Sequence, residues 1–268
     1  MTLPVFTPSI SAEMRAIITA KLAEIEAEHG VRILFAIDSG SRAWGFPSPD
    51  SDYDVRFVYA HEPDWYLSLK PGRDVIELPI SDELDIGGWD LRKALNLLLS
   101  ANPVLLEWLS SPIRYLWQEA PTAELIALAE KVTFGTASRH HYLNLGEGQW
   151  ARHIADQTEV NAKKYFYILR PALALRWLRL NPDVLPPMNL QALVAGLGLP
   201  DETVREIADL VTRKAELSEI GSGPRIAVID TLIAEEFALA KAAKSPAEKR
   251  VLAPQAEALF RRIVKGAL

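Results

Sequence analysis

The chain contains no cysteine. This absence excludes a disulfide framework, a thiolate zinc site and a cysteine nucleophile. No apolar run reaches the roughly eighteen residues that a membrane-spanning helix requires. The first thirty residues have the pattern of an amphipathic helix, with Glu13, Lys21 and Glu26 among its charges, and not that of a secretion signal. We therefore expect a cytoplasmic protein without a membrane partner.

Two common phosphate-binding loops are also absent. The chain has no Walker A loop ending in Gly-Lys-Ser or Gly-Lys-Thr, and no Gly-x-Gly-x-x-Gly fingerprint. The formal net charge of −6 argues against a broad basic footprint on nucleic acid. If the protein binds phosphates, a different loop and a local group of cations must do so.

One window is basic within this acidic chain. Between Ala137 and Leu180 there are seven Lys or Arg against three Asp or Glu, a net charge of +4. Such a segment suits a triphosphate or a short RNA end, and the alternative is a solvated charged helix face. Within it, Lys163, Tyr167 and Arg170 recur at helical spacing on one face, with Lys164 nearby. This face is predicted to bind the triphosphate or to stack a base on Tyr167.

The most informative segment begins with a Gly-Ser turn. Gly40-Ser41-Arg42-Ala43-Trp44-Gly45 follows an apolar strand, and Asp52-Tyr53-Asp54 then leads into a second strand. Two neighbouring carboxylates repel each other unless a cation lies between them. Mg²⁺ is often held by one or two carboxylates together with substrate phosphates. A phosphate-binding turn beside paired carboxylates predicts chemistry on a nucleoside triphosphate.

This pattern resembles the nucleotidyltransferase superfamily of DNA polymerase beta, which adds a third carboxylate on a later strand. Asp85, between Leu84 and Ile86, fits that position. The competing residue is Asp90, which opens an apolar-periodic helix pattern and is otherwise explained as a charge at the positive end of that helix. The resemblance implies that Asp52, Asp54 and Asp85 are catalytic and hold two Mg²⁺ (or Mn²⁺) ions.

Longer strings narrow the resemblance to the predicted nucleotidyltransferases called YcgL-type, or RNA-repair-associated polymerase-beta-like proteins. The strings, from about residue 31 to 190, are Gly-Ser-Arg-Ala-Trp-Gly, Ser-Asp-Tyr-Asp-Val-Arg-Phe, Gly-Trp-Asp-Leu-Arg-Lys-Ala-Leu, Asn-Pro-Val-Leu-Leu-Glu-Trp-Leu and Lys-Lys-Tyr-Phe-Tyr-Ile-Leu-Arg-Pro. The resemblance implies the fold and the metal site more strongly than the substrate.

The phosphates of the nucleotide have a predicted site of their own. Ser41 and the N–H groups from Gly40 to Arg42 are expected to hold the β and γ phosphates, helped by the N-terminus of a following helix. Arg42 and Arg56 either bind phosphate or pair with nearby carboxylates. His140, His141 and His153 have no spacing that indicates a zinc site, and their roles stay open.

The fold class predicted is α+β (α/β): a catalytic domain with a mixed sheet over residues 1–118, then an all-helical domain over 119–268. A first helix is expected over 9–29, with Ser9 or Ser11 as N-cap and Gly30 as the stop. Strands are expected over 31–38, 53–60, 75–80, 83–86 and 113–117. Helices are expected over 89–101, 103–110, 121–133, 137–156, 158–180, 189–197, 201–219, 224–243 and 254–265.

The expected activity is transfer of a nucleoside monophosphate from an NTP, with ATP as the favoured donor, to an acceptor hydroxyl. The RNA-repair resemblance implies that the acceptor is an RNA or DNA 3′ end, and the short acidic chain favours addition without a template. Other acceptors stay open, namely a protein hydroxyl (AMPylation) or a small molecule. A non-catalytic nucleotide sensor is the alternative of a different class, and the intact carboxylates count against it. The sequence leaves the oligomeric state open.

Overall fold

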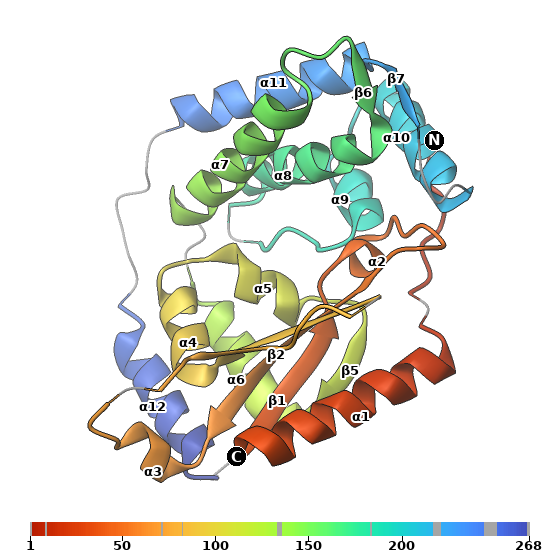
Figure 1. Ribbon diagram of the computed structural model, residues 1–268. Helices are drawn as coiled ribbons and strands as arrows, with labels where there is room; N and C mark the ends of the chain where they lie inside the picture. The colour runs from red at the N-terminus through yellow and green to blue at the C-terminus, as the bar shows by residue number, and fades with distance from the viewer. Residues whose placement is uncertain are drawn as a thin grey trace. The chain divides into compact units, whose positions relative to one another are not determined.

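The computed structural model describes residues 2–8, 10–70, 72–81, 83–132, 136–182, 184–216, 221–243 and 251–266. The chain divides into two compact units (Figure 1). The sheet unit comprises Pro8–Ala43, Asp52–Thr133 and Lys249–Leu268. The helical unit comprises Met1–Thr7, Trp44–Ser51 and Phe134–Glu248. Each unit is therefore built from segments that are separated in the sequence.

The sheet unit carries five strands with helices on both faces. Its elements are α1 (Ala12–His29), β1 (Val31–Asp38), β2 (Tyr53–His61), α3 (Pro63–Tyr66), β3 (Val75–Glu77), β4 (Leu84–Asp90), α4 (Leu91–Leu99), α5 (Pro103–Leu109), β5 (Arg114–Trp117), α6 (Glu119–Ala129) and α12 (Ala253–Val264). The strand order is β3-β4-β2-β1-β5. Only β2 and β4 run parallel among these neighbours, so the sheet is mixed, as predicted.

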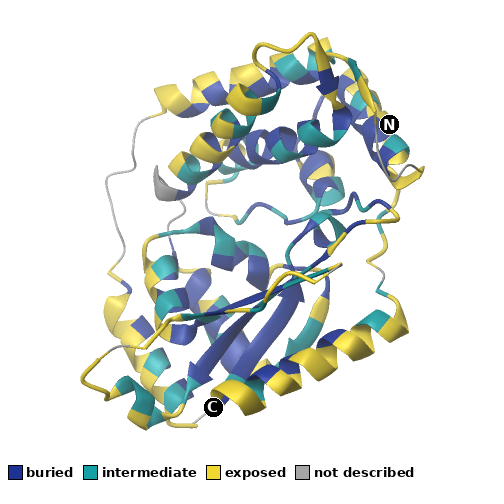
Figure 2. Cartoon of the chain, viewed as in Figure 1, coloured by how far each residue is buried: buried dark blue, intermediate teal, exposed yellow. Residues whose placement is uncertain are grey.

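Helix α1 covers one face of this sheet. Ser11 caps the helix by accepting a hydrogen bond from the Met14 N–H, and Gly30 ends it in the left-handed conformation. Residue 9, where the helix was predicted to begin, lies outside the described residues. Three buried side chains of α1 pack on the inward residues of β2, which alternate along the strand because successive side chains point to opposite faces: Ile18, Leu22 and Ile25 on Tyr53, Val55, Phe57 and Tyr59. In Figure 2 the strands β1 and β2 are mostly dark blue, and α1 presents its exposed residues outward.

Strand β4 is longer than predicted. The pattern suggested a strand over 83–86 and a helix from residue 89, but β4 extends to Asp90 and α4 begins at Leu91. The sequence does not predict this extension, because glycines such as Gly87 and Gly88 weaken a strand. A Cβ at Gly88 would overlap the Phe57 ring, so the missing side chain lets Phe57 pack against the β4 backbone.

The helical unit is built around one buried helix, α8 (Ala162–Leu180), which continues through Pro171. An apolar stripe of this helix is buried and consists of Tyr165, Phe166, Leu169 and Leu173. The other elements are α7 (Thr136–His153), β6 (Glu159–Asn161), α9 (Leu190–Gly196), α10 (Asp201–Glu216), β7 (Ser222–Pro224) and α11 (Ala227–Ala242).

Two helix starts in this unit were predicted too early. Residues 159–161 form strand β6, which pairs with β7, and α8 begins only after Asn161, whose side chain caps it. Likewise β7 ends at Pro224 and α11 begins at Ala227. Short strands that pair over a long sequence separation leave no periodic signal. Helix α6 ends at Ala129, earlier than the predicted end at residue 133. Residue 133 itself and the predicted helix end at 217–219 lie outside the described residues.

The grouping of elements differs from a division at residue 118. Helices α6 and α12 belong to the sheet unit. The reason is packing: α12 buries Ala256, Leu259 and Ile263 and contacts α4, α6 and β2. The short segment Trp44–Ser51, by contrast, belongs to the helical unit, although the Gly-Ser turn precedes it and the carboxylates follow it.

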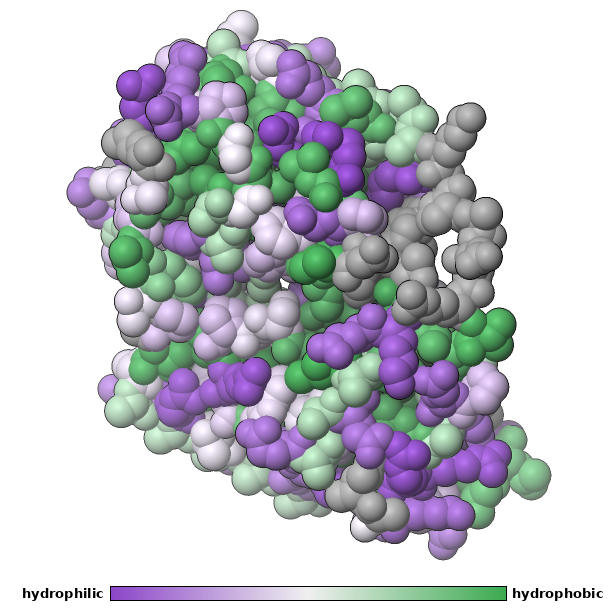
Figure 3. Space-filling model, turned by 180° about the vertical axis from the view of Figure 1, so that it is seen from behind, coloured by the Kyte–Doolittle hydropathy of each residue, from purple (hydrophilic) through white to green (hydrophobic). Residues whose placement is uncertain are grey.

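None of the described helices is long and apolar enough to cross a membrane. On the face seen in Figure 3, hydrophilic and hydrophobic side chains are interspersed. Large exposed apolar side chains such as Val5, Leu69 and Val251 are far apart in the sequence.

One buried carboxylate is important for the helical unit. Glu236 of α11 is 1% exposed and accepts hydrogen bonds from Arg176 at 2.9 Å and from Arg179 at 2.7 Å, both on α8. We predict that Glu236→Ala lowers the free energy of unfolding by about 2–4 kcal/mol, because two cations lose their shared partner. Urea unfolding would measure this. The neighbouring exposed Glu235 provides the control, and Glu235→Ala should change stability little; equal effects of the two changes would contradict the prediction.

Candidate active site

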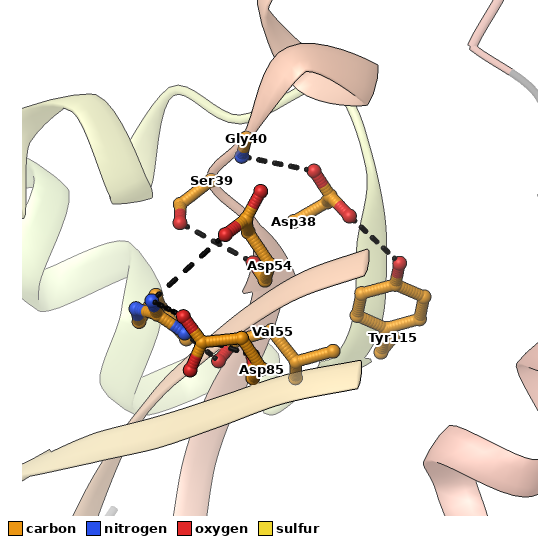
Figure 4. A network of polar contacts seen from close by, with 8 residues as sticks. Asp38, Ser39, Gly40, Asp54, Val55, Asp85 and Tyr115 are labelled. Carbon is orange, nitrogen blue, oxygen red and sulfur yellow. Dashed lines mark hydrogen bonds and ion pairs between the residues drawn. The ribbon is translucent and has the colours of Figure 1, made fainter. Parts of the chain in front are cut away.

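The candidate site lies where β1 ends and where β2, β4 and β5 begin (Figure 4). We call this end of the sheet the sheet edge. Asp38 is the last residue of β1, whereas Asp54 and Asp85 each lie one residue into β2 and β4. Because β2 and β4 are parallel, Asp54 and Asp85 are direct partners in the register. Tyr115 of β5 reaches the same edge. Three carboxyl groups far apart in the sequence thus meet beside the Gly-Ser turn.

Arg56 balances part of this negative charge. Its side chain lies on the same face of β2 as that of Asp54, and its guanidinium lies 2.7 Å from Asp85 Oδ2 and 4.0 Å from Asp54 Oδ1. It also donates to the main-chain carbonyls of Val55 and Asp85. Of the two predicted roles, the structure shows pairing with carboxylates.

The protonation of Asp54 is tuned by this arrangement. Burial raises the pKa of Asp54, Asp85 and Asp52 raise it further, and Arg56 opposes them. The side chains of Asp54 and Asp85 keep 33% and 35% of their surface exposed. Asp52 precedes β2 and is exposed. A cation brought to this edge would therefore meet carboxylates that solvent can still reach.

Gly40 allows the turn to approach Asp54. A Cβ at Gly40 would overlap Asp54 Oδ2, so only glycine leaves room for the carboxylate at this point of the backbone. The Ser39 N–H and hydroxyl both donate to the Asp54 carbonyl, at 2.8 and 3.2 Å. Turn and strand are thereby joined directly.

A fully buried carboxyl group fixes the start of the turn. Asp38 accepts hydrogen bonds from the Gly40 N–H at 3.0 Å and from the Tyr115 hydroxyl at 3.1 Å. Its main-chain carbonyl accepts a third from Ser111. Burial raises the pKa of Asp38 to about 6, with these hydrogen bonds acting against it.

The hydrogen bond from the Gly40 N–H to Asp38 corrects the predicted phosphate site in one respect. The Gly40 N–H is used inside the protein by Asp38, so it does not point at a ligand. The helix that follows, α2, contains only Ser41–Trp44, and a single turn carries a small dipole. Arg42 of this turn lies 3.9 Å over the Tyr53 ring. Ser41 and Arg42 remain the predicted phosphate-binding part of the turn.

The segment between the turn and the carboxylates is anchored in the helical unit. Gln191 donates to the Gly45 carbonyl at 2.6 Å, and the buried Lys214 donates to the Phe46 carbonyl at 2.6 Å. The Phe46 ring stacks on Phe166 with centroids 4.4 Å apart. The two halves of the motif are thus connected by a segment that α8, α9 and α10 hold.

The predicted face on α8 is not uniform. Arg170 is buried, donates to the Met188 carbonyl and lies 4.8 Å over the Trp44 ring, so its predicted role in binding nucleotide is replaced by a role in packing. Lys163, Lys164 and Tyr167 are half-buried and keep accessible surface. Helix periodicity placed Arg170 on their face, but Met188 and Trp44 pack against its side chain.

The residues at the sheet edge fit a hard divalent cation by donor type. Asp54 and Asp85 offer carboxylate oxygens side by side, which is a set that Mg²⁺ accepts together with phosphate oxygens. Among the described residues, no group of three or more His, Cys, Asp or Glu is arranged to hold a metal. The two-ion site with Asp52 as a ligand therefore stays a prediction. Asp90 caps α4 and accepts from Tyr66, which agrees with its structural interpretation.

Sequence reasoning missed Asp38 and Tyr115. The available signal was Asp38 itself, a carboxylate closing a strand whose other residues are nearly all apolar. A charge at the end of a buried strand requires hydrogen-bonding partners. Tyr115 could not be found, because its contact with Asp38 spans 77 positions.

Two comparisons with known proteins bear on this site. The model of a family described as the RNA repair pathway DNA polymerase beta family matches residues 14–262. The uncharacterized protein YcgL of Bacillus subtilis (strain 168) is 42% identical over 255 residues, which cover 94% of this chain and 97% of that protein. Both matches extend over the sheet edge and the helical unit.

The close approach at Gly40 can be tested by a double-mutant cycle. We predict that Gly40→Ala lowers the free energy of unfolding by about 1–3 kcal/mol, because the added methyl group displaces the Asp54 carboxylate. In an Asp54→Ala background the same change should cost less. Gly87→Ala is the control, since a Cβ there meets its neighbours at 3.8 Å. Additive effects in urea unfolding would show that the two residues do not compete for space.

Asp38 should give a pH-dependent stability. Because its pKa is raised from 3.8 to about 6, the folded state binds this proton more tightly than the unfolded state, and stability falls as pH rises through this window. Asp38→Asn does not titrate but can still accept from the Gly40 N–H. The stability of the wild type relative to this variant should fall by about 2–3 kcal/mol between pH 4 and 7. Parallel curves of unfolding free energy against pH would contradict this.

Proposed function

This chain belongs to the RNA repair pathway DNA polymerase beta family, and we propose that it transfers a nucleoside monophosphate from an NTP to the 3′ hydroxyl of an RNA or DNA end. ATP is the favoured donor, and no template is required. The family is of the nucleotidyltransferase type and is associated with RNA repair. The observation that supports this activity most is the register of Asp54 against Asp85, next to the Gly-Ser turn.

The reaction joins the acceptor oxygen to the α phosphorus of the NTP. The bond from the α phosphorus to the bridging oxygen breaks, and pyrophosphate leaves. The hydroxyl proton goes to a carboxylate of Asp52, Asp54 or Asp85, or to solvent. A bound Mg²⁺ or Mn²⁺ would neutralise phosphate charge and lower the pKa of the attacking hydroxyl. Asp54 and Asp85 would hold such an ion, with Asp52 as the predicted third ligand.

The other residues position these groups. Arg56 bonds Asp85 and lies near Asp54, so it limits the repulsion between them and keeps both carboxylates at the edge of the sheet. Asp38 and Tyr115 hold the first amide of the turn. Ser41 and Arg42, next in the turn, are the residues that we propose to contact the phosphates.

The activity is tested with α-labelled NTPs and parallel RNA, DNA and protein acceptors in Mg²⁺ or Mn²⁺. We predict label at an RNA or DNA 3′ end. Asp54→Asn and Asp85→Asn should each lower transfer by about two orders of magnitude or more, the scale on which loss of one electrostatic group acts in active sites. Asp64→Asn changes an exposed carboxylate of α3 in the same unit and should leave transfer unchanged.

Other outcomes would replace the proposal. Label on a protein hydroxyl would indicate AMPylation. Metal-dependent NTP binding without transfer to any of the acceptors would indicate a nucleotide sensor. Full activity of Asp54→Asn would remove the sheet edge from the mechanism.

A further inference from the structure

The seven cations of the basic window between Ala137 and Leu180 differ in their partners. Three of the seven are engaged inside the helical unit: Arg170 by Met188 and Trp44, and Arg176 and Arg179 by Glu236. These three support the fold. The basic character predicted from the sequence must therefore be sought in the remaining side chains.

A second group gathers where α7 ends and α8 begins. It consists of Arg152, His153, Lys163 and Lys164, which we call the α7–α8 cluster. Helices α7 and α8 contact each other, which brings the end of α7 and the start of α8 into one region of the helical unit. The charges of Lys164 and Arg152 also lower the pKa of His153, after burial as the first cause. Lys164 Nζ also lies 5.7 Å from the centre of the Tyr167 ring. The cluster thus combines positive charge with an aromatic surface.

The positive charge of the α7–α8 cluster is not balanced by ion pairs within the described part of the chain. Arg152, Lys163 and Lys164 form no ion pair with an acidic side chain of the described part of the chain. Asp156 and Glu159 lie in the same connection, yet both are exposed and neither is paired with them. In a protein of net charge −6, unpaired neighbouring cations are not a consequence of a shortage of acidic residues.

The N-terminus of α8 increases the electrostatic repulsion within the α7–α8 cluster. Lys163 and Lys164 occupy the first turn of α8, which contains no acidic residue, and the N-terminus of a helix carries partial positive charge. Cations at this end are repelled by the dipole as well as by one another. The arrangement is stabilised when an anion binds to it.

We infer that the α7–α8 cluster, with Tyr167 beside it, binds the phosphodiester backbone of a single-stranded nucleic acid, the acceptor of the transfer reaction. The inference rests on the proposed function and names the acceptor site within it. Single strands are typically bound by cations along the backbone together with aromatic rings that stack on bases. The cluster offers both on one part of the helical unit.

The triphosphate fits this cluster less well. Its expected partners, the carboxylate pair for a metal ion and the Gly-Ser turn, are together at the sheet edge. The cluster has no carboxylate pair of that kind, and its cations come from two helices. The anionic reactant that still lacks a site is the acceptor.

Binding can be measured without catalysis, by fluorescence anisotropy of a labelled single-stranded RNA of about ten nucleotides, a length within the range that such sites cover. The full chain is used in EDTA without NTP, and a DNA of the same sequence forms a parallel arm. Lys163→Gln/Lys164→Gln should weaken binding about tenfold or more. It should also reduce the slope of log affinity against log salt by about 1.4, because each lost phosphate contact on a single strand removes ~0.7.

A charge-matched control distinguishes binding at the α7–α8 cluster from a general electrostatic attraction to the protein. Arg205→Gln/Arg213→Gln removes two cations from α10 of the same unit and should change affinity by less than about twofold. Arg152→Gln, at an exposed position, should weaken binding in the same direction as the lysine variant. Equal losses from the α10 pair and the lysine pair would overturn the inference.

Two further outcomes decide the case. The lysine variant should melt at or above the wild-type temperature, because repulsion is removed; a clear decrease would show that the lysines hold the fold and would overturn the inference. Loss of NTP binding with unchanged RNA and DNA binding would assign the cluster to the triphosphate. Asp54→Asn should bind RNA as the wild type does, so a failed transfer assay and a failed binding assay are distinguishable.

Discussion

The contact between the Gly40 backbone and the Asp54 carboxylate is the constraint on which the site depends. No side chain fits between them, so the turn can approach β2 only as glycine. Ser39 then bonds to the Asp54 carbonyl, and Asp38 holds the Gly40 amide. These bonds bring the Gly-Ser turn, which is predicted to bind phosphate, and the carboxylate pair to the same edge.

Charge balance decides which ligands this edge can take. Asp54 and Asp85 lie directly beside each other, and Arg56 compensates only part of their charge. The carboxylates keep enough exposure to meet a cation from solvent. Asp38, by contrast, is buried, and its raised pKa marks the energetic cost of ionising a carboxyl group that positions the backbone.

The segment between the Gly-Ser turn and Asp52 belongs to the helical unit. The segment Trp44–Ser51 leaves the Gly-Ser turn, is held by Gln191, Lys214 and Phe166, and returns just before Asp52. The same unit carries cations of two kinds. Those paired with Glu236 maintain the packing of α8 on α11. Those at the α7–α8 junction form the group that we propose binds the acceptor.

The sequence by itself determined the elements whose signals are local. The apolar run of β1, the end of α1 at Gly30 and the family motif are all signals carried by neighbouring residues. The start of α1 was narrowed to Ser9 or Ser11, and the structure shows Ser11 as the cap. The pairing of Asp54 with Asp85 was predicted only as a resemblance, and the metal and nucleotide roles stay predictions. Tertiary structure alone decided that Tyr115 reaches Asp38, that Arg170 is covered, that α12 packs against the sheet unit and that residues 159–161 form a strand. These features join residues far apart in the chain, and their energies come from burial and hydrogen bonds that no local pattern contains.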